Sequence, residues 1–125
     1  MSVVFIIKYK DGIILQKRDA TYLRFPSQWT LTGGAEEDEL PEIAAKRELK
    51  EELNLDVPLT FVTNYTFNFE IPETLPIFIG EIDDLSKISL GEGIGFAVFT
   101  KNELHKVEND VIRKAIKELM KWYKT

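Results

Sequence analysis

The stretch GGAEEDELPEIAAKRELKEELNL, residues 33–55, contains the strongest pattern in this chain of 125 residues. Pro41 suits the first turn of a helix, and the residues that follow it are mostly good helix formers. Asn54 can adopt the left-handed conformation that ends a helix. The sequence therefore predicts a helix from Pro41 to Leu53.

Three carboxylates share one edge of this predicted helix. Glu48, Glu51 and Glu52 fall within an arc of roughly 100° at 3.6 residues per turn. Like charges at this spacing destabilise a bare helix by about 0.2–0.5 kcal/mol per pair, so the arrangement favours a bound cation. Mg²⁺ prefers carboxylate and phosphate oxygens, and Ala44, one turn back on the same edge, leaves room for a ligand. The alternative is a solvated surface helix in a glutamate-rich chain.

Before the helix, the sequence predicts paired strands. Val3–Tyr9 and Ile13–Arg18 are apolar-rich and flank Lys10-Asp11-Gly12, and Asp-Gly between such segments is a strong hairpin signal. Asp19–Gln28 is typical of a loop, and Trp29–Thr32 of a short strand that enters the Gly33-Gly34 pair.

After the helix, Thr60–Glu70 and Pro76–Ile82 are predicted strands, with Pro72 and Pro76 confining the connection between them. Ile94–Thr100 is a further candidate strand. Asn109–Tyr123 has an apolar stripe at helical spacing, and Asn109 can serve as its N-cap. The residues of this stripe are Ile112, Ile116, Leu119 and Tyr123.

Composition limits the class of protein. The chain is 44% hydrophobic and 30% charged, which is typical of one globular domain, and it has no cysteine for a disulfide or a thiolate site. The longest apolar run, VVFII, is far too short to cross a membrane, so we expect a cytoplasmic protein with no membrane partner. A net charge of −5 argues against binding duplex nucleic acid. A small phosphate-bearing molecule remains a candidate if a metal offsets the repulsion.

Residues 33–55 resemble the Nudix box, a pattern of one glycine, spaced glutamates and an arginine before a glutamate-rich helix. The matching residues are Gly33, Glu39, Arg47, Glu48, Leu49, Glu51, Glu52 and Leu55. Asn54 replaces the family's glycine, Thr32-Gly33-Gly34 replaces proline-glycine-glycine, and the following loop is one residue shorter. The resemblance implies a single α/β domain, residues 1–125, with the Nudix fold of a mixed β-sheet sandwiched between helices.

The resemblance also implies roles for the box residues. Glu48, Glu51 and Glu52, with the Gly33 carbonyl, would bind Mg²⁺, or Mn²⁺ as a substitute, at the substrate diphosphate; Gly34 adjoins the same substrate-binding turn. Glu39 would support the metal shell, or would instead be a first-turn carboxylate favouring the helix dipole. Arg47 would orient the glutamates, or would form a surface ion pair with Glu51.

Three residues outside the box resemble functional residues of the family. Glu92, in LGEGIGF, resembles a second, distant carboxylate of MutT-type members and is a candidate general base or metal ligand; the alternative is an exposed turn residue. Arg18 matches a basic residue that often contacts substrate phosphates, or is solvated after a strand. Asn109 resembles a base-contacting asparagine, although N-capping already explains it.

The function implied is that of a Mg²⁺-dependent hydrolase that cleaves a diphosphate bond in a nucleotide or a nucleoside diphosphate-linked small molecule. A nucleoside triphosphate pyrophosphohydrolase of MutT type is the leading hypothesis. A pyrophosphatase of ADP-ribose or nucleotide sugars is the second, because Pro72 lies close to the position where such members carry a proline. A catalytically silent nucleotide-binding domain is the third. The sequence leaves the oligomeric state open.

Overall fold

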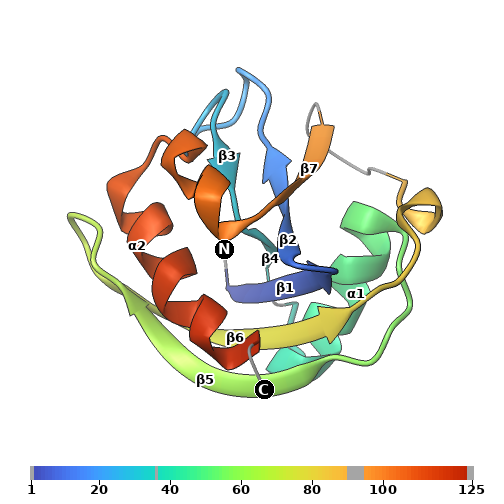
Figure 1. Ribbon diagram of the computed structural model, residues 1–125. Coiled ribbons are helices and arrows are strands. Elements are labelled where there is room, and N and C mark those ends of the chain that lie inside the picture. The colour runs from blue at the N-terminus through green and yellow to red at the C-terminus, as the bar shows by residue number, and fades with distance from the viewer. Residues whose placement is uncertain (1, 36, 90–94, 124–125) are drawn as a thin grey trace.

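In the computed structural model, which describes residues 2–35, 37–89 and 95–123, a mixed β-sheet lies between two α-helices (Figure 1). The helices are α1, Pro41–Leu53, and α2, Asp110–Leu119. The strands are β1 (Val3–Tyr9), β2 (Gly12–Lys17), β3 (Trp29–Thr30), β4 (Thr32–Gly34), β5 (Thr60–Phe67), β6 (Glu73–Glu81) and β7 (Gly95–Phe99). This architecture confirms the α/β fold expected from the sequence.

Strand β1 is the centre of the sheet. It pairs in parallel with β6, in a register that places Val4 opposite Ile77 and Lys8 opposite Glu81, and β6 pairs antiparallel with β5. All residues from Val3 to Ile7 are buried, because helices cover both faces of this strand.

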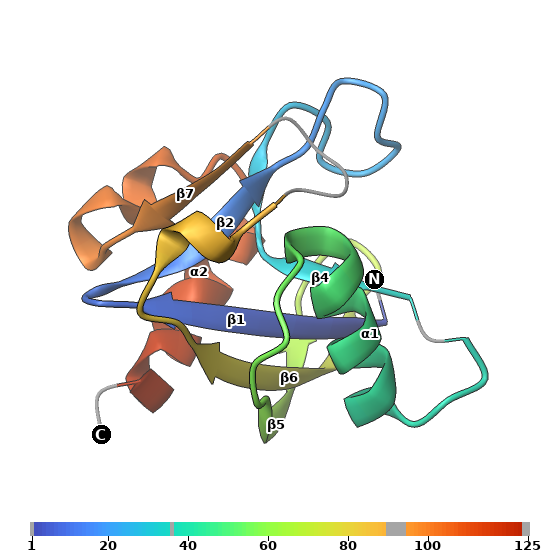
Figure 2. The same ribbon diagram turned by 90° about the vertical axis from the view of Figure 1, so that its right-hand side faces the viewer.

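The other edge of β1 is divided between two strands. Its first half, Val3–Phe5, pairs with β4, and its last residues pair with β2. Figure 2 shows β2 turning away from β1 to pair with β7, while β4 stays beside the start of β1. Strands β2 and β4 diverge next to α1, and residues of all three elements line the candidate site.

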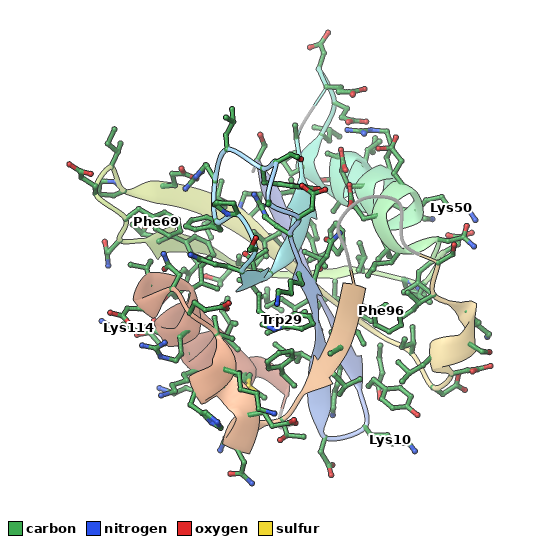
Figure 3. The ribbon with its side chains drawn as sticks, turned by 90° about the horizontal axis from the view of Figure 1, so that it is seen from above. Lys10, Trp29, Lys50, Phe69, Phe96 and Lys114 are labelled. Atoms are coloured by element: carbon green, nitrogen blue, oxygen red, sulfur yellow. The ribbon has the colours of Figure 1, made fainter. Side chains whose placement is uncertain are left out.

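The core has two parts, one on each face of the sheet. Alternate residues of β1 point to opposite faces, so Val4 and Ile6 pack with α2, whereas Phe5 and Ile7 pack with α1. The exposed Lys50 of α1 and Lys114 of α2 project on opposite sides of the molecule (Figure 3).

Helix α1 has the bounds that the sequence predicts. Pro41 occupies the first turn, and Asn54 ends the helix with φ 56° and ψ 36°, its backbone N–H donating to the Lys50 carbonyl. Asparagine at this position therefore takes the left-handed conformation for which glycine is the usual residue.

Most other predicted elements are confirmed with small shifts. The Trp29–Thr32 strand is interrupted at Leu31, and β6 begins at Glu73, so Pro76 lies inside a strand and not in the connection. Pro76 is tolerated because its only register partner is Asn64 of β5; pairing with β1 begins one residue later. The C-terminal helix changes to a 3-10 helix at Met120–Tyr123, and two further 3-10 helices, Leu85–Lys87 and Lys101–Lys106, were not anticipated. No helix in the described parts of the chain combines the length and apolar character needed to span a membrane.

Candidate active site

A cavity of about 330 Å³ lies between α1, the diverging strands β2 and β4, and the start of the loop after β2. The three box glutamates, both glycines and Arg18, all predicted from the sequence as site residues, line this cavity. The lining residues are Gln16, Arg18, Tyr22, Leu31, Gly33, Gly34, Ala35, Glu48, Glu51 and Glu52. The structure thus brings together six residues of the predicted site from three separate segments of the chain.

Glu48 is the buried member of the glutamate cluster. Its relative exposure is 8%, and burial raises the pKa of its carboxyl against the opposing effect of a hydrogen bond from Arg47. The carboxyl fits because Gly34 lacks a side chain: a Cβ there would lie 2.0 Å from Glu48 Cδ and 2.2 Å from Oε2. A side chain at Gly34 would therefore displace the Glu48 carboxyl from its present position.

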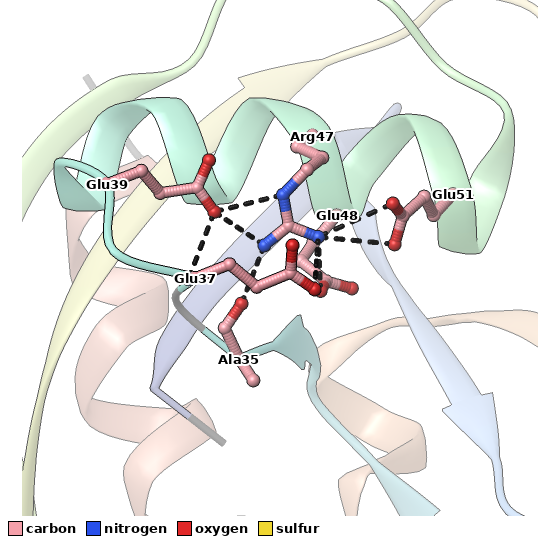
Figure 4. Close-up of polar contacts among 6 residues, drawn as sticks. All are labelled: Ala35, Glu37, Glu39, Arg47, Glu48 and Glu51. Carbon is pink, nitrogen blue, oxygen red and sulfur yellow. Dashed lines mark hydrogen bonds and ion pairs between the residues drawn. The ribbon is translucent and has the colours of Figure 1, made fainter.

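Arg47 of α1 connects the carboxylates and is not itself among the residues that line the cavity (Figure 4). Its Nε donates to Glu39 Oε1 at 2.9 Å, and its Nη2 donates to the same oxygen at 2.6 Å and to the Ala35 carbonyl at 2.8 Å. Its Nη1 donates to Glu48 Oε1 at 2.9 Å and reaches Glu51 Oε2 at 3.3 Å. One planar guanidinium therefore joins the loop before α1 to two of the three glutamates.

Glu39 lies outside the cavity lining and precedes Leu40, the N-cap residue of α1. It therefore does not stand in the first helical turn, and its side-chain partner is Arg47. The hydrogen bonds from Arg47 hold the pKa of Glu39 below its usual range. Glu39 anchors the arginine that contacts Glu48 and Glu51.

Glu52 meets a residue that the sequence analysis did not identify. Gln16 of β2 is 6% exposed, and its Nε2 donates to Glu52 Oε2 at 3.4 Å. A buried amide needs a hydrogen-bond partner. A glutamine within the apolar run Gly12–Lys17 could therefore have predicted a polar contact beneath this strand.

The donor set fits a hard divalent cation. Glu48, Glu51, Glu52 and the Gly33 carbonyl offer only oxygen, which Mg²⁺ prefers, and Glu48 is a desolvated carboxylate whose charge a cation would compensate. Among the described residues, no three acidic or histidine side chains already converge on one point. Arg47 donates to Glu48 and Glu51 in this conformation, so their side chains would have to shift to bind a metal.

Arg18 and Tyr22 line the cavity from the segment that follows β2. The Arg18 guanidinium lies 4.9 Å from the centre of the Tyr22 ring, and its Nη1 donates to the Arg24 carbonyl at 3.1 Å. Burial lowers the pKa of Arg18. Tyr22 was not predicted as a site residue, because only the path of the loop brings it to the cavity.

Two sequence-based expectations lie apart from the cavity, and a third falls outside the part of the chain that the structure describes. The Asn109 side chain accepts from the backbone N–H groups of Val111 and Ile112 at 2.9 and 3.0 Å, so it caps α2, and it does not line the cavity. Ala44 is fully buried in the core and leaves no room for a ligand, because its edge of α1 faces the sheet. Glu92 lies outside the described residues.

Comparison with known proteins identifies the family. The chain is 33% identical over 97 residues to an isopentenyl-diphosphate Delta-isomerase 2 of Photorhabdus laumondii, covering 71% of this chain and 55% of the relative. It is 39% identical over 62 residues to the nucleoside triphosphatase NudI of Klebsiella pneumoniae, covering 50% and 44%. The chain thus spans about half the length of these curated relatives. The MutT protein of Methanosarcina mazei has the same fold, with a TM-score of 0.80, 18% identity and coverage of 98% and 94%. Because the model of the NUDIX domain matches residues 1–123, the chain belongs to the NUDIX family.

Proposed function

We propose that this protein is a divalent-metal-dependent hydrolase of a diphosphate bond in a nucleotide-like substrate, and that a nucleoside triphosphate is its preferred substrate. The observation that supports this proposal is the composition of the cavity. Three glutamates that can hold a cation line it from α1, and Arg18 lines it from just after the end of β2. A metal–diphosphate complex has the complementary charge distribution.

The proposed roles follow from where each residue lies. Glu48, Glu51, Glu52 and the Gly33 carbonyl would hold Mg²⁺, or Mn²⁺ in its place. When bound, such a metal neutralises phosphate charge and increases the acidity of water. Arg47 would keep Glu48 and Glu51 in place from outside the cavity, and Arg18 would contact the phosphates. Glu92 stays a candidate base or ligand.

Isomerisation of an allylic diphosphate is a second candidate, since one relative is an isopentenyl-diphosphate isomerase. Moving a double bond requires proton transfer to and from carbon, and the apolar chain of such a substrate needs apolar walls. The lining of the cavity is mainly polar or charged, with Leu31 as its one large aliphatic residue among those described. This composition favours hydrolysis at phosphorus over chemistry at carbon.

A substrate screen tests the proposal directly. The protein would be incubated with Mg²⁺ and nucleoside triphosphates, ADP-ribose, nucleotide sugars, dinucleoside polyphosphates and isopentenyl diphosphate, and the products separated by chromatography. We expect release of a nucleoside monophosphate and pyrophosphate from at least one triphosphate. If isopentenyl diphosphate alone were converted, the protein would be an isomerase and not a hydrolase. If it bound nucleotides without turnover, it would be a catalytically silent domain.

Two matched variants link activity to the cavity. Glu52→Gln should lose nearly all hydrolysis but keep the parent melting temperature, because it removes a ligand charge and leaves helix propensity almost unchanged. Glu42→Gln makes the same change on the exposed first turn of α1, outside the cavity, and should retain parent activity. Equal activity in both variants would contradict the metal-site assignment.

A further inference from the structure

The loop between β2 and β3, Asp19–Gln28, forms one wall of the cavity and has a closed shape. The Arg18 N–H donates to the Gln28 carbonyl at 3.1 Å, so the two ends of the loop meet. Within it, the Asp19 carboxylate accepts from the Thr21 N–H at 2.8 Å. Tyr22 of this loop lines the cavity.

Arg24 connects this loop to a distant strand. Its Nη1 forms an ion pair of 2.7 Å with Glu73 Oε1, at the start of β6, and its guanidinium lies 5.1 Å from the centre of the Phe69 ring. On the other side, the Arg24 carbonyl accepts the hydrogen bond from Arg18 Nη1. Arg24 thus links Glu73 of β6 to Arg18, which lines the cavity.

Aromatic contacts reinforce the same connection. The rings of Phe25 and Phe69 lie 5.4 Å apart between centroids, and Phe69 in turn stacks on Phe67, the last residue of β5, at 5.8 Å. Figure 3 shows Phe69 beside the loop that carries Tyr22 and Arg24. Two independent kinds of contact therefore fix the loop against the β5–β6 hairpin.

Glu73 places a negative charge next to Arg24, whose backbone carbonyl accepts from Arg18. Burial lowers the pKa of Arg18, and the nearby charge of Arg24 lowers it further. The pair of Arg24 and Glu73 is partly exposed, with side-chain exposures of 41% and 30%, and such pairs add little to global stability. Its effect is expected to be local.

We propose that Arg24 is a positioning residue for substrate binding: its ion pair with Glu73 holds the loop so that Arg18 and Tyr22 line the same cavity as the glutamates. The inference rests on the proposed function, since Arg18 acts on the substrate only if the cavity takes a diphosphate. Arg24 itself does not line the cavity.

The test combines kinetics with a measurement of loop order. Glu73→Gln and Arg24→Gln should each raise KM about 5- to 10-fold with kcat little changed, because ground-state binding is weakened and the glutamates are untouched. The double variant should resemble either single variant, because both changes break one connection. Hydrogen exchange of the amides in residues 19–28 should become faster in all three, without a lower melting temperature.

The control variant is Asp110→Asn, which removes the ion pair with Arg113 on α2, away from the cavity. It should leave KM and loop exchange at parent values. The inference is overturned if Glu73→Gln keeps the parent KM, or if kcat, KM and melting temperature all change together. If the parent hydrolyses nothing, the proposed function fails separately, and the dissociation constant for inorganic pyrophosphate with Mg²⁺, measured by calorimetry, replaces KM. Parent-like affinity and loop exchange in Glu73→Gln would then refute the positioning role.

Discussion

Substituting Gly34 by alanine should disrupt the glutamate cluster without touching a glutamate. The added Cβ would lie 2.0 Å from Glu48 Cδ, whereas ordinary contact begins at 3.4 Å, so the carboxyl must move by about 1.4 Å, the difference between the two distances. That shift is enough to break the 2.9 Å hydrogen bond between Arg47 Nη1 and Glu48 Oε1. Gly34 is not in the left-handed region, so the effect is one of contact and not of backbone strain.

The expected cost is about 1–3 kcal/mol in the free energy of unfolding, the usual range for overpacking a buried site. In a chain of this length that lowers the melting temperature by roughly 4–12 °C. Affinity for Mn²⁺, measured by calorimetry, should fall about 10-fold or more, because the hydrogen bond that orients Glu48 is lost.

Two controls separate this clash from a general effect of alanine. No described heavy atom lies within 4 Å of a Cβ built on Gly95, so Gly95→Ala should leave stability and Mn²⁺ affinity at parent values. In a Glu48→Ala background the clashing atoms are absent, so Gly34→Ala should lower the free energy of unfolding only slightly. Parent-like stability and affinity in Gly34→Ala, or an undiminished cost in the Glu48→Ala background, would refute the reasoning.

Further predictions concern caps and pH. Asn54→Gly should melt at or slightly above the parent temperature, since glycine adopts the left-handed conformation without a side-chain penalty; a clear decrease would reveal an unrecognised contact of Asn54. Asn109→Ala should lower the free energy of unfolding by about 0.5–2 kcal/mol, measured in urea, yet leave KM unchanged, and a raised KM would instead indicate a substrate contact. Hydrogen bonds from Thr100 hold the pKa of Glu103 below its ordinary value of 4.5. The stability gained from Glu103 is therefore complete above that pH and lost below it, so the difference in unfolding free energy between the parent and Glu103→Gln should disappear on acidification.

The helix and the carboxylates could be predicted because their signals are local. Pro41 and Asn54 fix the ends of α1, and the spacing of Glu48, Glu51 and Glu52 follows from helix geometry alone. The strands were also recognisable, since apolar runs between turn residues have few other interpretations.

The rest of the site depends on tertiary contacts that no local pattern encodes. Gln16 faces Glu52 only because β2 leaves β1 beside α1, and Tyr22 reaches the cavity only because Arg24 and Phe25 fix its loop to the β5–β6 hairpin. Asn109 matched a family position by local sequence, but in the structure its side chain caps α2.

The central position of β1 has a consequence for how the chain acquires its structure. Val4 pairs with Ile77, a sequence separation of 73 residues, so β1 gains its parallel partner only after β6 has been synthesised. Until then, one edge of an apolar strand lacks its partner and can pair with other chains. We expect folding to be limited by this distant parallel pairing, and nascent chains that end before residue 81 to aggregate or to require a chaperone.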